Sequence, residues 1–273
     1  SFTSIREDYQ KVRERRQGRK AEKVPLKQAR ENAYDLKRKA IKPKLEGKTV
    51  TKKIKISEVV DYIDWAPFAM TWGMKPKDLK GNVGLELLKD AKSTLRNLEN
   101  KIEINFSFAI DKCIKHYDDL ILSRGEHSIT YNFLRQSKKK SSPNLCLTDF
   151  VHSQDWIGSF AIWVDGIDCL ADSFKSKNDD YMSIMIQSLG DRLAEATAEW
   201  LHEKVRKKWW GYSKDESFSN EDLIKERYLG IRPAPGYPAC PDHTQKIKIL
   251  NWLKVGSRIE LTEGLTMKPK SAI

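Results

Sequence analysis

The residues best suited to bind a small charged molecule lie in one unusual stretch, from Gly230 to His243. It contains four of the ten prolines. Each proline fixes φ at about −65° and lacks a backbone donor, so neither a helix nor a central strand can form there. We expect a stiff, extended loop from which Arg232 and Tyr237 project. The Arg guanidinium suits a carboxylate or phosphate, and the Tyr ring offers a flat face with a polar tip. A rigid loop with such groups indicates a binding site.

A second candidate is Asp64, whose neighbours we expect to be largely buried: Trp65, Phe68, Met70 and Trp72. A carboxylate in such surroundings needs hydrogen-bond donors or a cation, because an unpaired charge is costly away from water. From the residues alone two interpretations stay open. Asp64 either caps the end of a helix or loop, or binds a positively charged group of a ligand.

Apolar spacing predicts the elements that must position these groups. Helical periodicity is found in residues 4–17, 56–64, 86–99, 182–209, 220–228 and 245–255. Strict alternation predicts a half-buried strand over residues 102–110, and further strands are expected at 119–122, 128–134, 144–151, 156–164 and 258–261. Short strands with intervening turns favour an α+β fold, a single domain with a central twisted antiparallel β-sheet and flanking helices.

Three acidic residues on these helices have different expected surroundings. Glu195 and Glu199 lie off the apolar face of the helix at 182–209, so we expect both in solvent. Glu226 falls in the last turn of the helix at 220–228, with Gly230 as its C-terminal cap. A carboxylate there meets the unfavourable end of the helix dipole, which hints at a compensating partner.

Length and composition limit the number of domains and the location of the protein. The 273 residues fit one large domain or two. Residues 1–55 are basic, polar and poor in apolar residues, so we expect a strap over the domain or a linker from a preceding domain, with the folded domain at 56–273. The chain begins without Met, which suggests a fragment of a longer protein. No membrane span or signal peptide is expected, and four scattered cysteines indicate reduced thiols in the cytoplasm.

Several kinds of chemistry have no support in the sequence. The net charge of +12 invites a nucleic-acid interpretation, but no accompanying motif supports it, and a basic surface that docks an acidic protein fits better. Neither of the two glycine-rich motifs that bind nucleotides occurs, GxGxxG at the start of a helix or GxxxxGK(S/T). One Cys-x-x-His pair, Cys240 and His243, does not make a metal site. No catalytic Ser-His-Asp set can be assigned, and no catalytic residue is expected in this chain.

Three segments together carry a resemblance. Residues 232–243, Arg-Pro-Ala-Pro-Gly-Tyr-Pro-Ala-Cys-Pro-Asp-His, resemble the signature of the activation domain of cobalamin-dependent methionine synthase. Residues 61–68, Asp-Tyr-Ile-Asp-Trp-Ala-Pro-Phe, and residues 191–195, Asp-Arg-Leu-Ala-Glu, match in the right order. The resemblance covers nearly the whole chain and implies a C-shaped domain that binds S-adenosylmethionine.

The resemblance also implies roles for particular residues. Asp64 would bind the amino group of S-adenosylmethionine and Arg232 its carboxylate. The remaining ligand contacts would come from the proline-rich loop, at Ala234, Gly236, Tyr237 and Ala239. Glu195 and Glu226 match carboxylates near the methyl donor and the cobalamin face. The family continues into another strand whose aromatic residue helps to hold the adenosine, whereas this chain stops at Ile273, so we expect an adenosine site without that residue.

The implied function is the reactivation of methionine synthase, the 5-methyltetrahydrofolate–homocysteine methyltransferase. The module would present the methyl group of S-adenosylmethionine to cobalamin carried by a neighbouring domain of the same full-length chain. The electron for this reductive methylation would come from a flavodoxin-like protein or a flavoprotein reductase. Without the cobalamin, homocysteine and folate domains, the chain alone is not expected to make methionine. The alternative is a scaffolding module that docks a redox protein without binding S-adenosylmethionine.

Overall fold

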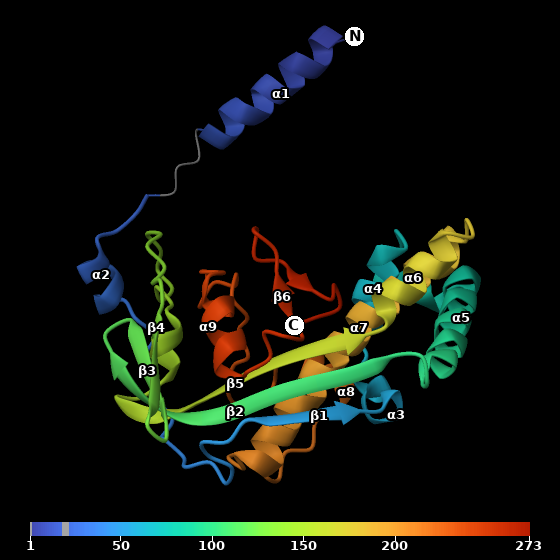
Figure 1. Cartoon of the computed structure of the whole chain (residues 1–273). Coiled ribbons are helices and arrows are strands. Elements are labelled where there is room, and N and C mark those ends of the chain that lie inside the picture. The colour runs from blue at the N-terminus through green and yellow to red at the C-terminus, as the bar shows by residue number, and fades with distance from the viewer. Residues whose placement is uncertain (1, 18–21) are drawn as a thin grey trace.

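Two lobes rise from the ends of a long twisted sheet and give the molecule a C shape (Figure 1). The structure, a computed structural model, describes residues 2–17 and 22–273. Its elements are, in chain order, α1 (Phe2–Gln17), α2 (Leu26–Glu31), β1 (Val50–Ile54), α3 (Ile56–Val59), the 3₁₀ turn η1 (Val60–Tyr62), α4 (Trp65–Thr71), the 3₁₀ turn η2 (Pro76–Lys80), α5 (Asn82–Leu98), β2 (Glu103–His116), β3 (Asp119–Arg124), β4 (His127–Asn132), the 3₁₀ turn η3 (Leu147–Phe150), β5 (Gln154–Asp165), α6 (Ile167–Lys175), α7 (Asp180–Lys204), the π-helical turn η4 (Val205–Trp209), α8 (Asn220–Ile224), α9 (Gln245–Trp252), β6 (Glu260–Leu261) and β7 (Met267–Lys268).

The sheet is built around β2. Strand β5 pairs with it along one edge, in a register that runs from Glu103 opposite Asp165 to Ile114 opposite Gln154. Along the other edge β1 pairs with its first half and β3 with its second half, and β4 continues from β3 as a hairpin. All of these pairs are antiparallel. The predicted α+β fold with a central antiparallel sheet is confirmed.

Strand β2 is buried on both faces, so the prediction of a half-buried strand was wrong. The alternating apolar residues Ile104, Phe106, Phe108 and Ile110 face a core shared with α7. On the opposite face, Ala109 packs in a second core with residues of α9 and the segment that follows it. Because helices cover both sides, the alternation separates two cores rather than a core from solvent.

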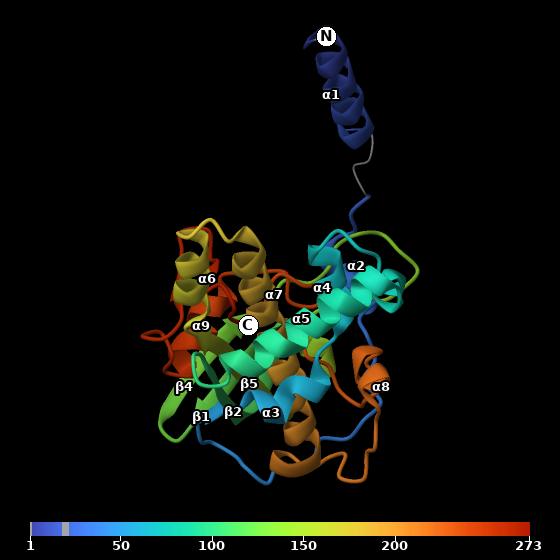
Figure 2. The same ribbon diagram turned by 90° about the vertical axis from the view of Figure 1, so that its right-hand side faces the viewer.

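Helix α7 is the long element that crosses the sheet, and α4, α5 and α6 gather around its N-terminal half (Figures 1 and 2). Its predicted apolar stripe is largely buried, with Ile186, Leu189 and Leu193 all at or below 1% exposure. The helix continues to Lys204 and then changes to the π-helical turn η4. That turn places the ring of Trp209 in a stack on Phe108, with the centroids 4.5 Å apart.

The helix predicted at residues 56–64 is shorter, because it divides into α3 and the turn η1. A further helix, α4, begins directly afterwards and contains Pro67 in its first turn. Proline is tolerated there because the backbone N–H groups of a first turn have no helical partner. Of the expected core residues Phe68 is fully buried, but Met70 is 59% exposed, contrary to prediction.

One predicted strand is absent. Residues 144–151 contain the turn η3 instead, because side chains take up the backbone groups. The carboxylate of Asp149 accepts the N–H of Cys146 at 3.0 Å and is clamped by Arg135. Asp side chains that bond nearby backbone groups offer the chain an alternative to a strand ladder.

The basic N-terminal segment lies against the β3–β4 lobe over part of its length. Val24 donates its N–H to the carbonyl of Ser137 at 2.8 Å. Further along, Arg30 pairs with Asp118 at 2.8 Å. The short helix α2, which contains Arg30, was not predicted. Residue 1 and residues 18–21 of this segment lie outside the described residues. Within the described part of the chain, no helix has the length and apolar character needed to cross a membrane.

Candidate functional site

The proline-rich loop is compact rather than extended, contrary to the prediction. The N–H of Gly236 donates to the carbonyl of Cys240 at 2.8 Å, and the N–H of Tyr237 donates to Ala234 at 3.1 Å. Gly236 has φ of +107°, and a Cβ there would lie 2.4 Å from the ring of His243. Only glycine fits both conditions. The loop is therefore a pair of tight turns, with Gly236 packed against the ring of His243.

This folded loop presents its side chains in two directions. Ala239 is buried at 9% exposure, and Cys240 lies in the core beneath β3 and β4. Burial raises the pKa of the Cys240 thiol to about 11, so the thiol is protonated and inert at neutral pH. Tyr237 points outward and is 62% exposed. Buried residues thus anchor the loop while an aromatic ring stays accessible.

Arg232, at the start of the loop, is bound to α7. Its Nη1 donates to Oε2 of Glu199 at 3.1 Å. The Glu199 side chain is 10% exposed and that of Arg232 is 20% exposed. The prediction that Glu199 lies in solvent was wrong, because the segment around Arg232 folds back over this turn of the helix. Burial raises the pKa of Glu199, while the charges of Arg232 and Arg206 oppose that shift.

Below this pair lies a second buried cation. Arg206 is fully buried, its Nε donates to Glu216 at 2.9 Å, and its guanidinium lies 4.0 Å from the ring centre of Tyr228. His202 contacts the same ring edge-on. Burial, helped by the charges of Arg206 and Arg232, lowers the pKa of His202 to about 2. The imidazole is therefore neutral at physiological pH, and the cluster is held by the two Arg–Glu pairs.

Asp64 is the N-cap of α4. Its Oδ1 accepts the N–H of Ala66 at 2.9 Å, as the capping interpretation predicts. No hydrogen bond to Oδ2 occurs among residues 2–17 and 22–273. One carboxylate oxygen therefore caps the helix, and the other is available to a ligand. The side chain is half-buried.

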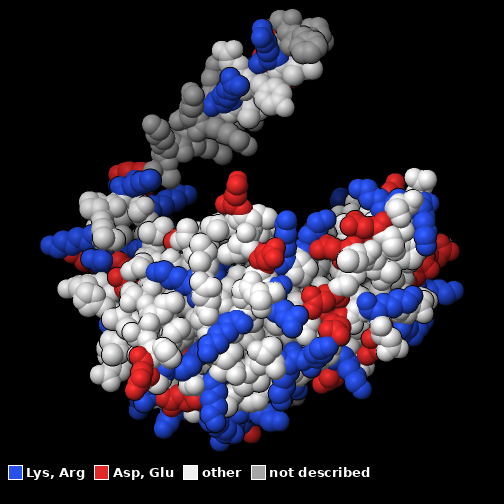
Figure 3. Space-filling model, in the orientation of Figure 1, with Lys and Arg blue, Asp and Glu red and all other residues white. Residues whose placement is uncertain are grey.

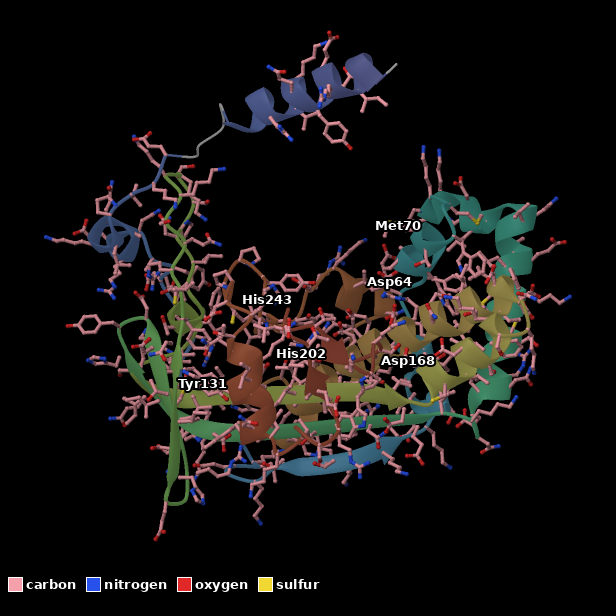
Figure 4. The ribbon with its side chains drawn as sticks, turned by 45° about the horizontal axis from the view of Figure 1, so that its top comes forward. Asp64, Met70, Tyr131, Asp168, His202 and His243 are labelled. Carbon is pink, nitrogen blue, oxygen red and sulfur yellow. The ribbon has the colours of Figure 1, made fainter. Side chains whose placement is uncertain are left out.

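Helix α7 brings Asp64 and Arg232 to the same region. Glu203 accepts a hydrogen bond from the hydroxyl of Tyr62, two residues before Asp64. One turn earlier on the same face, Glu199 holds Arg232. Four helical residues span only about 6 Å along the axis. Asn220 adds a third link, because its side chain donates to the carbonyl of Ile63 at 3.3 Å. Figure 4 shows Asp64, His202 and His243 along the concave side of the molecule.

Glu195 is exposed on α7, as predicted. It lines a hollow of about 260 Å³ together with Asp191 and the C-terminal residues 270–273. Ser271 donates to Asp191 across this hollow at 2.9 Å, and burial raises the pKa of the Asp191 carboxyl. The last residues also add to the sheet, since Ile273 and Ile162 exchange backbone hydrogen bonds.

Glu226 does not lie in a helix, so the dipole argument for it was wrong, as was the assignment of Gly230 as the helix cap. Helix α8 ends at Ile224, and Glu226 follows in the left-handed region with φ of +52°. Its N–H donates to Leu223 at 2.9 Å and that of Arg227 donates to Asp222 at 3.1 Å. These two bonds form a Schellman motif with Glu226 at the position that usually holds glycine. The side chain is exposed.

Three members of this site were not predicted from the sequence: Arg206, His202 and Tyr228. Glu199, His202 and Arg206 follow one another at helical spacing and so share one face of the chain, which was the available signal. Residues 2–17 and 22–273 contain no group of three or more His, Cys, Asp or Glu side chains placed to hold a metal ion.

Two comparisons with known proteins show what this chain is similar to. A family model described as vitamin B12 dependent methionine synthase, activation domain, matches residues 55–273. A crystal structure of the MetH reactivation domain bound to AdoHcy is similar to this chain with a TM-score of 0.83 and 40% sequence identity. That match covers 92% of this chain and 84% of the other. The range matched by the family model contains Asp64, α7 and the loop that follows Arg232.

Proposed function

Because the chain belongs to the family of vitamin B12-dependent methionine synthase activation domains, and so to a methyltransferase, we propose that it binds S-adenosylmethionine between α4, α7 and the proline-rich loop. The resemblance seen in the sequence is confirmed at the level of the family. The observation that carries the proposal is the attachment of Arg232 and of the Asp64 segment to one turn of α7.

Each end of the ligand has a matching group. The guanidinium of Arg232 binds the ligand carboxylate through the donors that Glu199 leaves free. Oδ2 of Asp64 accepts a hydrogen bond from the amino group. The adenosine lies against the loop, where Tyr237 is an exposed ring and the backbone of Ala234, Gly236 and Ala239 can approach closely.

Glu195 and Glu226 are exposed carboxylates on the segments that flank this site. We place them near the methyl donor and the face that receives cobalamin. A carboxylate near the sulfonium stabilises the positive charge of the ligand before transfer. The charge of Glu226 opposes ionisation of Glu199, the partner of Arg232, and so favours a higher pKa of that carboxyl.

The methyl acceptor, cobalamin, belongs to a neighbouring domain of the full-length chain. This chain's own residues hold the methyl donor and present its sulfonium. Because the methyl acceptor is carried by another domain, the chain alone does not make methionine. The family match begins at residue 55, which supports a binding domain at 56–273 preceded by a connecting segment at 1–55, and the end of that segment, β1, adds a strand to the sheet of the domain. The four cysteines are free, which fits a cytoplasmic setting.

The electron donor is an acidic flavodoxin-like protein or flavoprotein reductase. The net charge of +12 and the Lys and Arg side chains along the convex side support such a partner (Figure 3). If attraction between opposite charges guides docking, the association rate of the chain with flavodoxin, measured by stopped flow, should fall steeply as salt rises from low to physiological ionic strength. A rate independent of salt would contradict electrostatic docking.

Calorimetric titration of the chain with S-adenosylmethionine tests the function itself. We expect saturable binding of one ligand per chain, with S-adenosylhomocysteine competing for the same site. Absence of binding to either compound, in a chain that is folded and still associates with the electron donor, would contradict the proposal and favour a scaffolding module.

A further inference from the structure

We propose that Glu199 is a positioning residue that fixes the guanidinium of Arg232 for the carboxylate of the bound ligand. The inference rests on the proposed function and adds to it a residue that touches no ligand. Glu199 acts through Arg232, from one turn of α7 beneath the loop.

Arg232 is oriented by its hydrogen bond to Glu199, and the other nearby ion pair does not replace this contact. Glu199 Oε2 accepts the only side-chain hydrogen bond made by Arg232 within residues 2–17 and 22–273. The other acidic partner in the cluster, Glu216, is already engaged by the Nε of Arg206. Arg206 Nη1 lies 4.0 Å from Glu199 Oε1, beyond hydrogen-bond distance. Arg232 therefore depends on Glu199 for its orientation.

The burial of Glu199 is hard to explain by stability alone. The residue is 8% exposed, and its Oε1 has no hydrogen-bond partner among the described residues. A buried ion pair often contributes no more than apolar residues of the same volume. A long Arg side chain, however, loses much rotamer freedom when it binds a ligand. A carboxylate that holds the guanidinium in advance reduces that loss and raises the affinity.

The geometry leaves room for the ligand. Glu199 holds Nη1, and the Arg232 side chain remains 20% exposed. Arg has five N–H donors in a planar fork, so one carboxylate can bind one edge while a second carboxylate binds another. The Glu199 carboxylate thus occupies one edge of the Arg232 guanidinium, and the ligand carboxylate binds another edge.

The test compares two ligands that differ only in the carboxylate, S-adenosylmethionine and decarboxylated S-adenosylmethionine. We measure the affinity of both for the wild-type chain, for Glu199→Gln and for Glu199→Asp, which keeps the charge but shortens the reach. Asp111→Asn is the matched control, because Asp111 is also a buried carboxylate paired with an Arg, Arg124, in the other lobe. Thermal melting of every variant verifies that it is folded.

Glu199→Gln should weaken S-adenosylmethionine binding on the order of tenfold, the effect expected when an orienting partner is removed. Glu199→Asp should weaken it as well, and affinity for the decarboxylated ligand should change by less than about twofold in both variants. Asp111→Asn should leave both affinities unchanged. In an Arg232→Ala background, Glu199→Gln should have no further effect on affinity, because the residue it acts through is gone.

Four results would overturn the inference. Equal losses for the two ligands would indicate a general structural role, and unchanged affinity for S-adenosylmethionine would indicate no role. An additional loss in the Arg232→Ala background would show that Glu199 acts directly. A wild-type chain that binds neither ligand would overturn the proposed function as well, whereas a wild-type chain that binds S-adenosylmethionine leaves that function intact.

Discussion

Replacing Glu226 by glycine should make the protein more stable. Glu226 has φ of +52° at the end of α8, with the two backbone bonds of a Schellman motif. A left-handed conformation costs a residue with a Cβ roughly 1–2 kcal/mol. Glycine removes that cost but adds about 0.5–1 kcal/mol of backbone entropy to the unfolded chain. The net gain is about 0.5–1 kcal/mol, because the strain relieved exceeds the entropy added.

The control is Glu226→Ala, which removes the carboxylate but keeps the Cβ. Urea unfolding of both variants separates backbone strain from any effect of the side chain, and the glycine variant should exceed the alanine variant by about 1 kcal/mol. A gain of this size raises the melting temperature by about 2–4 °C in a domain of this length. If glycine is no more stable than alanine at residue 226, the assigned strain does not exist.

Backbone strain of this kind concentrates at binding sites, so a residue whose strain glycine would relieve is a candidate functional residue. Glu226 is exposed and belongs to the segment that leads to Arg232. The same glycine variant should therefore lower the rate of methyl transfer in the full-length enzyme while it stabilises the domain. Unchanged transfer would leave the strain without a functional explanation.

Three further predictions concern the cluster around α7. Arg232→Ala should weaken S-adenosylmethionine binding by about 2–3 kcal/mol in calorimetry. It should also lower the free energy of unfolding by about 1–3 kcal/mol, because Glu199 is left buried without a partner, and adding Glu199→Gln should restore stability but not affinity. Asp64→Asn should change stability by no more than about 1 kcal/mol, because Asn also caps a helix. It should, however, reduce the rise in melting temperature that the ligand causes, and an undiminished rise would leave Asp64 as a cap only. His202 has a pKa of about 2 when folded, so the unfolded chain binds the extra proton below about pH 6.5 and stability falls as pH drops through this range. Between pH 6.5 and pH 5 this amounts to roughly 2 kcal/mol in urea unfolding, and His202→Gln should remove that part of the pH dependence.

Much of the sheet could be predicted because its signal is local. The alternation from residue 102 to 110 marks the first part of β2, which continues to His116, and the predictions for β3, β4 and β5 hold within a few residues. Strand β1 was not predicted, because it lies in the basic segment expected to be a strap. The alternation does not tell which element packs against the other face of β2. Ala109, between the large apolar residues, is small, and it packs against residues of α9, which lies far along the chain.

The site was predictable where its residues form a contiguous motif and unpredictable where they meet through the fold. The loop and Asp64 are recognisable from neighbouring residues. Glu199 is a polar helix residue whose burial depends on Arg232 and on the segment that contains Glu216. The end of α8 was misplaced for a related reason, because the chain uses Glu226 where the rules for helix ends favour glycine.

A crystal structure of this chain with S-adenosylmethionine or S-adenosylhomocysteine tests the central claim most directly. We predict the ligand carboxylate within about 3 Å of an Arg232 nitrogen other than Nη1, and the amino group within about 3 Å of Asp64 Oδ2. The adenosine should lie against Tyr237 and the backbone of the loop. A ligand that occupies another part of the molecule, with Arg232 and Asp64 both more than about 5 Å away, would contradict the assignment of this site.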